Sequence, residues 1–147
     1  MKLSELLQQE PNADILALWL KKIPYAAYLG IQAQVEGNDI IFIMPADRKL
    51  IGNTALPALH GGVVGAFMEQ AAGLHLVAKM NNPVLPKIIN FSLDYLRSAR
   101  LQDSYARCSL TRQGRQIANV SITAWQEHID TPFAIARAHY LVPGTDH

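Results

Sequence analysis

One glutamate stands in a long apolar stretch of the chain, in line with a row of glycines. Gly61, Gly65, Glu69 and Gly73 follow one another at intervals of four residues, and residues four apart lie on one face of a helix. Each glycine costs a helix interior about 0.5–1 kcal/mol relative to alanine, and an unpaired carboxylate buried among apolar groups is costly too. Either Glu69 faces the open space of a site, or the glycines allow close packing and Glu69 reaches an arginine or solvent.

The run His60-Gly61-Gly62 opens the same stretch. If a helix begins here, its first backbone N–H groups have no intrahelical partners, and the positive end of the helix dipole favours a developing negative charge. These amides could therefore polarise a carbonyl group and hold its oxyanion. The alternatives are that the glycines make a tight entry turn and that His60 is structural, as a cap of the helix.

The element that carries these residues is predicted to be a helix from His60 to about Met80, roughly 30 Å long at ~1.5 Å per residue. Apolar or small residues occupy nearly every position of it, which is typical of a buried helix. The chain around it reads as helices at 3–9 and 12–22, a hairpin of strands with its turn at Gly37-Asn38, a loop at 45–57 and four later strands. The expected strands cover residues 31–35, 39–44, 87–96, 104–112, 116–127 and 133–142. This order predicts an α+β fold in which a curled sheet wraps around one long central helix.

The run His60-Gly61-Gly62 with Glu69 nine residues after His60 resembles the active-site signature of the hotdog-fold acyl-CoA thioesterases. The resemblance is to the branch of the phenylacetyl-CoA and hydroxybenzoyl-CoA thioesterases, and it covers about residues 24–143. Residues 91–99 resemble the family's strand after the helix, and the order of elements is that of the hotdog fold. The resemblance implies a single hotdog domain over residues 1–147, with residues 1–24 as an N-terminal helical extension and residues 143–147 as a loose tail.

The same resemblance implies roles for individual residues. Glu69 would be the catalytic carboxylate, acting as nucleophile on the thioester carbonyl or as general base on a water. The amides of Gly61 and Gly62 would hold the oxyanion, with Gly61 as the first choice of donor. His60 would position the loop and the thioester, or stabilise the departing thiolate.

The loop before His60 departs from the family pattern. Relatives usually place an asparagine or glutamine six residues before the histidine and often a glycine three before it, where this chain has Thr54 and Pro57. Asn53 stands seven residues before, so either the loop holds one extra residue and Asn53 reaches the site, or the polar partner is missing. Ile88 falls where some relatives keep a serine or threonine facing the carboxylate.

Basic residues predominate between Lys79 and Arg115, with seven lysines and arginines against two acidic residues. Such a surplus could bind the phosphates of coenzyme A through charge-assisted hydrogen bonds. Relatives bind the nucleotide near these strand ends, so Arg97, Arg100 and Arg115 are the candidates for coenzyme A binding. The alternative for each arginine is a solvated strand face.

The composition narrows the class of protein. Half of the 147 residues are hydrophobic and 17% are charged, as in a globular protein, and the net charge of +1 gives no strong attraction to nucleic acid or anionic membranes. The single cysteine, Cys108, cannot form an internal disulfide and suits a reducing cytoplasm. We expect no signal peptide, no membrane span and a cytoplasmic location. The other histidines lack metal-ligand spacing, and no metal or redox cofactor is indicated.

These observations predict an acyl-CoA thioesterase that hydrolyses a small or medium acyl or aryl thioester. The hotdog resemblance further implies a homodimer or homotetramer with its sites at the subunit interface. Two alternatives remain: a non-catalytic acyl-CoA binding module, which the altered Asn53–Pro57 loop permits, and a hotdog hydratase or dehydratase. The known members of the hydratase and dehydratase class place the acid farther from the histidine. The His-Gly-Gly opening also argues against that class.

Overall fold

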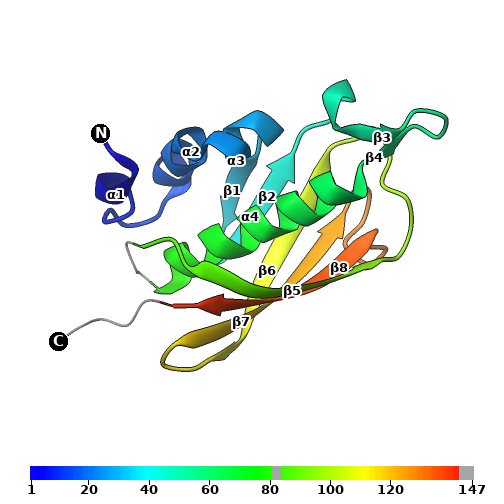
Figure 1. Cartoon of the computed structure of the whole chain (residues 1–147). Coiled ribbons are helices and arrows are strands. Elements are labelled where there is room, and N and C mark those ends of the chain that lie inside the picture. The colour runs from blue at the N-terminus through cyan, green and yellow to red at the C-terminus, as the bar shows by residue number, and fades with distance from the viewer. Residues whose placement is uncertain (81–83, 143–147) are drawn as a thin grey trace.

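The computed structural model describes residues 1–80 and 84–142, and its N-terminal part is helical (Figure 1). The three helices are α1 (Leu3–Leu6), α2 (Ala13–Lys22) and α3 (Pro24–Leu29). The predicted cap of α2 is confirmed, since the Asn12 side chain accepts a hydrogen bond of 3.0 Å from the Ile15 amide. Pro24 ends α2 as expected and also begins α3, where its missing N–H leaves no bond unmade. α1 is shorter than the predicted helix over residues 3–9.

A six-stranded antiparallel sheet forms the second layer, in the order β1-β2-β6-β7-β8-β5. Its strands are β1 (Gln32–Glu36), β2 (Asp39–Met44), β5 (Lys87–Tyr95), β6 (Ser104–Gln113), β7 (Ile117–Trp125) and β8 (Ala134–Leu141). Their ends lie within two residues of the predicted ones. Gly37 makes the β1–β2 turn with a φ of 62°, in the left-handed region that favours glycine. β1 and β5 are the edges of the sheet.

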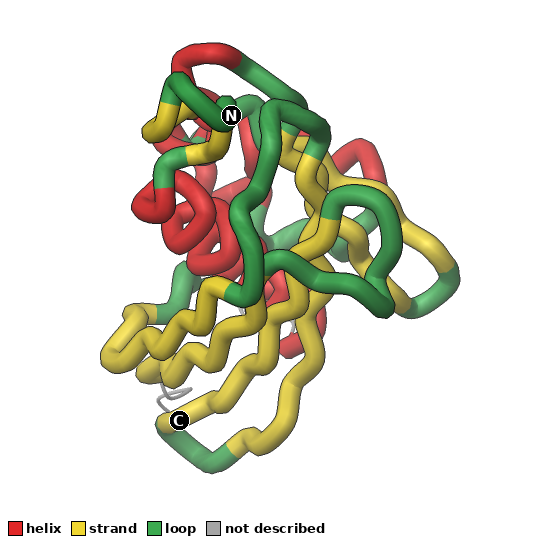
Figure 2. The backbone as a smooth tube through the Cα atoms, turned by 90° about the vertical axis from the view of Figure 1, so that its right-hand side faces the viewer, coloured by secondary structure: helices red, strands yellow, loops and turns green. Residues whose placement is uncertain are grey.

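The central helix, α4 (Gly61–Met80), lies across the concave face of the sheet (Figures 1 and 2). Alternate residues of the strands point toward it, and many of these are buried alanines that let the helix approach closely. They are Ala106 of β6, Ala118 and Ala124 of β7, and Ala134, Ala136 and Ala138 of β8. Phe67 and Met68 of α4 are fully buried against this face. The prediction of a curled sheet wrapped around one long helix is confirmed.

One face of α4 is not covered within the chain, and here the expectation of a wholly buried helix is wrong. Gly62 is exposed, and Ala66, Glu69, Gln70 and Gly73 are only partly buried. The sequence misled because an apolar surface can be covered by a second chain as well as by the helix's own sheet. Glu69 is consequently half-buried at an open surface instead of enclosed among apolar groups.

The segment between β2 and α4 is also more ordered than predicted. In place of one loop over residues 45–57, it contains the 3-10 helix η1 (Arg48–Leu50) and a small hairpin of β3 (Ile51–Asn53) and β4 (Ala58–Leu59). Strands this short, next to breakers such as Gly52 and Pro57, have no readable periodicity. The hairpin delivers the chain to the first residue of α4.

Two expectations fall outside the described residues, namely the helix stop at residues 81–83 and the loose tail at 143–147. Within the described part, none of the helices combines the length and apolar character needed to cross a bilayer.

His75 is a buried polar residue on the covered side of α4. Its side chain is 4% exposed, and its Nδ1 atom has no hydrogen-bond partner among the described residues. Burial, reinforced by the positive charge of Lys79, lowers the pKa of His75 to about 4, while Asp39 opposes this shift. Protonation of His75 must therefore oppose folding.

We expect the free energy of unfolding to fall as the pH drops through 6.5 toward 4, because the unfolded chain then binds a proton that buried His75 excludes. The contribution of neutral His75 to the free energy of unfolding is complete above its unfolded pKa. Roughly 2 kcal/mol of this contribution is lost between pH 7 and pH 5. Urea unfolding of wild type and His75→Leu at both pH values measures this loss. A stability difference between the two proteins that is the same at pH 7 and pH 5 would contradict the assignment.

Candidate active site

The N-terminus of α4 is organised by His60. The His60 carbonyl accepts hydrogen bonds from the amides of Val63 (3.0 Å) and Val64 (3.2 Å), and its Nδ1 atom accepts one of 2.9 Å from the Gly62 amide. Because Nδ1 is the acceptor, a neutral His60 carries its proton on Nε2, which remains available as a donor. The histidine thus caps the helix, which is the structural role named for it as an alternative from the sequence.

The bond to His60 separates the roles of the two glycines. The Gly62 amide is already occupied, whereas the Gly61 amide has no hydrogen-bond partner in the described part of the chain. Gly61 is the first helical residue, so its N–H lies at the positive end of the α4 dipole. Of the two predicted oxyanion donors, Gly61 is the one that is free.

A close approach of two backbones holds His60 in place. The His60 amide donates to the Leu50 carbonyl at 2.9 Å. A Cβ atom at Gly52 would stand 2.7 Å from the Cα of His60, so only glycine allows β3 to pass this close to the backbone of His60. The β3–β4 hairpin therefore fixes the start of α4.

Tyr95, at the end of β5, covers the first turn of α4. Its hydroxyl donates a hydrogen bond of 2.8 Å to the Gly61 carbonyl, and its side chain is 57% exposed. A Cβ atom at Gly61 would approach the Tyr95 hydroxyl to 3.1 Å. Sequence reasoning gave Tyr95 no role, since its contact with Gly61 spans 34 residues.

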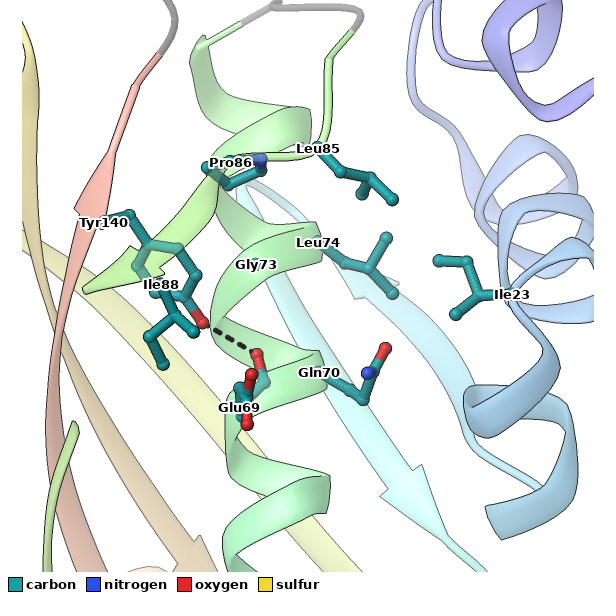
Figure 3. A pocket seen from close by; sticks show the side chains of 9 residues that line it. All are labelled: Ile23, Glu69, Gln70, Gly73, Leu74, Leu85, Pro86, Ile88 and Tyr140. Carbon is teal, nitrogen blue, oxygen red and sulfur yellow. Dashed lines mark hydrogen bonds between the residues drawn. The ribbon is translucent and has the colours of Figure 1, made fainter. Parts of the chain in front are cut away.

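Glu69 lies at an apolar pocket on the open face of α4 (Figure 3). No hydrogen bond or ion pair engages its carboxylate among the residues that the structure describes, and its backbone carbonyl accepts a bond of 2.9 Å from the Tyr140 hydroxyl. Burial, followed by the nearby charge of Glu69, raises the pKa of Tyr140, so this phenol stays neutral. Ile88 also lines the pocket, so the residue expected to stand in place of the relatives' serine or threonine lies near Glu69 and is apolar.

Gly61 and Glu69 are eight residues apart on one helix, which separates them by about 12 Å along its axis. A carbonyl group is only ~1.2 Å long. The free amide and the carboxylate of one chain therefore cannot act on the same carbonyl group.

Asn53 is held in its own turn. Its side-chain oxygen accepts a hydrogen bond of 2.9 Å from the Ala55 amide, and the residue is exposed in the β3–β4 hairpin. This bond engages the side-chain oxygen, so a substrate or a water would have to be oriented by the Nδ2 donor of Asn53.

Two of the three predicted coenzyme A residues come together. Arg97 and Arg100 line a surface pocket of about 200 Å³ between the β5–β6 loop and the segment that joins β7 to β8. The Gln126 side chain braces this pocket, accepting from the Arg100 amide at 3.0 Å and donating to the Arg100 carbonyl at 2.8 Å. Neither guanidinium has an ion-pair partner within the described ranges.

This arginine pocket lies close to the start of α4. Arg100 forms a β-bridge with Ala58, and the Leu59 amide donates to the Ala99 carbonyl at 2.8 Å. Arg115, in contrast, follows β6 at its far end, roughly 30 Å from the beginning of that strand at ~3.3 Å per residue. The three arginines do not form one site within a chain.

Other titratable groups of the described residues offer no further centre. No cluster of three or more His, Cys, Asp or Glu side chains there is placed to hold a metal ion. Cys108 is buried in the core, and burial raises the pKa of its thiol, as expected for a packing residue.

Comparison with known proteins identifies the family. The family model described as the thioesterase superfamily matches residues 56–133. This stretch is more than half of the chain and contains the start of α4, Glu69 and the loop that carries Arg97 and Arg100. The chain belongs to the thioesterase superfamily. The resemblance read from His60, Gly61, Gly62 and Glu69 is thereby confirmed at the level of the family.

Solved structures agree with this fold over 80% to 98% of the chain. A protein from Chromobacterium violaceum is 36% identical, with 98% of each chain covered and a TM-score of 0.73. A phenylacetic acid degradation-related protein from Ralstonia eutropha is 20% identical, covering 97% of this chain and 100% of its own at a TM-score of 0.74. A Streptococcus mutans protein bound to acetyl CoA is 18% identical, covering 80% and 91% at a TM-score of 0.67. Among curated proteins, no match was found.

Proposed function

We propose that this superfamily member is an acyl-CoA thioesterase that hydrolyses a small or medium acyl or aryl thioester. Glu69 acts as nucleophile on the thioester carbonyl or as general base on a water. The carbonyl oxygen becomes an oxyanion that accepts a hydrogen bond from the Gly61 amide. His60, whose Nε2 remains a donor, stabilises the departing thiolate.

The observation that carries this proposal is the open face of α4. It combines a free amide at a helix N-terminus with an unpaired, half-buried carboxylate about two turns later. The amide stabilises negative charge on the oxyanion. The carboxylate either attacks the carbonyl carbon or accepts a proton from water, and these are the two requirements of acyl transfer to water. No other part of the described chain offers this pair.

Because Gly61 and Glu69 lie about 12 Å apart along one helix axis, the proposal requires a second copy of the chain, so that each site takes the Gly61 amide from one subunit and Glu69 from the other. The molecule is suited to this. β5 is an edge strand with unpaired backbone groups on its outer side, and it lies next to the open face, where a Cβ atom at Gly65 would meet Leu93 at 3.5 Å. A homodimer, or a homotetramer built from such dimers, completes both sites.

The coenzyme A part of the substrate is assigned to Arg97 and Arg100. Two guanidinium groups that have no ion-pair partner among the described residues suit phosphate oxygens, and their loop adjoins the strand that leads into Gly61. That a distant relative binds acetyl CoA agrees with this assignment. Arg115 is a coenzyme A ligand only if the partner subunit brings it to the site.

Release of free thiol from a panel of acyl-CoA thioesters tests the function. The panel runs from acetyl to decanoyl and includes benzoyl and phenylacetyl, each measured beside the matching acyl pantetheine, which lacks the nucleotide. We expect turnover with a preference for the coenzyme A form. Tight acyl-CoA binding without any thiol release would overturn the enzyme and favour the non-catalytic binding protein, with the occupied Asn53 side chain as the feature to examine.

A further inference from the structure

The pocket beside Glu69 lies along the surface of α4 (Figure 3). It has a volume of about 140 Å³. The surface of α4 at Glu69 and Gly73 forms its floor, with Ile88 and Tyr140 on one side and Ile23 and Leu85 on the other. Ile23 comes from the junction of α2 and α3, so the N-terminal extension supplies one wall.

The chemistry of this pocket suits an apolar group attached to a carbonyl. Its walls are aliphatic or aromatic, and the Tyr140 hydroxyl is already engaged with the Glu69 backbone. Among the described residues that line the pocket, the polar side chains other than Tyr140 are on the helix, at Glu69 and its neighbour Gln70. An apolar cavity of ~150 Å³ holds one benzene molecule, so this pocket accommodates about six carbons.

Gly73 is not explained by packing. A Cβ atom there would lie 3.8 Å from the nearest atoms, which belong to the Tyr140 ring, and this is an ordinary contact distance. Alanine would therefore fit, and alanine favours a helix interior more than glycine does. The missing side chain keeps space open on the pocket floor, one turn beyond Glu69.

We propose that Gly73 is a specificity-determining residue. The space left by its missing side chain receives the far carbons of the acyl group, and Ile23 closes the opposite wall of the pocket. This proposal rests on the thioesterase function proposed above and specifies its substrate class: acyl groups of about six carbons, or one aromatic ring. The carbonyl carbon sits at Glu69, and the chain extends along α4 toward Leu85. The length of the pocket sets the preferred acyl group.

The test is kcat/KM for straight-chain acyl-CoA thioesters in wild type, Gly73→Ala and Gly73→Val. In wild type we expect kcat/KM to rise about fourfold per methylene up to roughly six carbons and then to stop rising. The valine should lower kcat/KM for hexanoyl-CoA about tenfold or more while leaving acetyl-CoA within about twofold. Alanine should have a smaller effect of the same kind. A loss that is equal for every acyl length would overturn the proposal and leave the thioesterase function standing.

Ile23→Ala provides the reciprocal test, because it widens the pocket from the other side. We expect its optimum to move to longer acyl groups. Ile15→Ala is the matched control, since Ile15 lies in the same extension and packs against the core outside the pocket. An unchanged length profile in Ile23→Ala, or the same shift in Ile15→Ala, would argue against Ile23 as a wall.

Failure of the proposed function gives a different result. If wild type releases thiol from no thioester, binding of non-hydrolysable S-alkyl-CoA thioethers of the same lengths can be measured by calorimetry. Weaker binding of only the long thioethers by Gly73→Val would support the pocket as an acyl site without catalysis. Equal affinity of both proteins for every length would overturn it. Circular dichroism checks that each variant is folded.

Discussion

Replacement of Glu69 by glutamine is expected to lower kcat for thioester hydrolysis by about 10³-fold or more. Glutamine preserves the size of the side chain but can neither attack a carbonyl carbon nor accept a proton from water. The Glu69 carboxylate has no ion-pair or hydrogen-bond partner within the described residues, so its neutralisation leaves no buried charge unpaired. The melting temperature should therefore change little. The Tyr140 bond to the backbone carbonyl is retained.

Two further variants make this result interpretable. Glu69→Asp keeps the carboxylate but shortens its reach, so it should retain part of the activity that glutamine loses. Glu36→Gln removes an exposed carboxylate of β1 that does not line the pocket and should have wild-type kcat. Full turnover by folded Glu69→Gln would show that another group performs the chemistry.

The second large effect is expected at the start of α4, where proline can replace Gly61. Proline has no N–H and is favoured at the first position of a helix, so Gly61→Pro removes the proposed oxyanion donor while keeping the helix. Loss of one such donor lowers kcat by about 10²–10³-fold.

Gly61→Ala is the matched control for this change. It adds the same Cβ atom, 3.1 Å from the Tyr95 hydroxyl, but keeps the amide, so any disturbance of Tyr95 is common to both variants. Steady-state kinetics of the pair therefore isolate the contribution of the N–H group. Equal activities of the alanine and proline variants would remove the Gly61 amide from the mechanism.

The sequence predicted most of the fold because its main elements have clear local patterns. The apolar run of α4, the alternating residues of β7 and the cap at Asn12 are readable over short windows. The β3–β4 hairpin was missed because contacts between distant residues create it, such as the bond from His60 to Leu50 and the close approach at Gly52. The apolar run alone predicted a buried α4, because a single sequence does not reveal what covers a helix, and only the position of Glu69 among the glycines pointed to an open face.

The residues of the candidate site also fall into those that the sequence could predict and those that it could not. His60, Gly61 and Glu69 could be named because they lie at fixed spacing in one continuous stretch, the cap and first half of α4, which resembles the family signature. Tyr95, Tyr140 and Gln126 were missed because they reach the site from strands and strand ends remote in sequence, without any local motif. Arg115 was grouped with Arg97 and Arg100 because relatives bind the nucleotide near these strand ends, but β6 carries the chain away from the other two arginines.

The account depends most on the claim that Glu69 of one subunit and the Gly61 amide of the other serve the same thioester. Two inactive variants test this directly. Glu69→Gln and Gly61→Pro chains with different tags are co-expressed, and the species carrying both tags is isolated and assayed for thiol release. In a twofold-symmetric dimer one of its two sites is intact, so we predict about half of the wild-type activity per dimer. A mixed dimer that forms normally but stays as inactive as either parent would contradict the shared site.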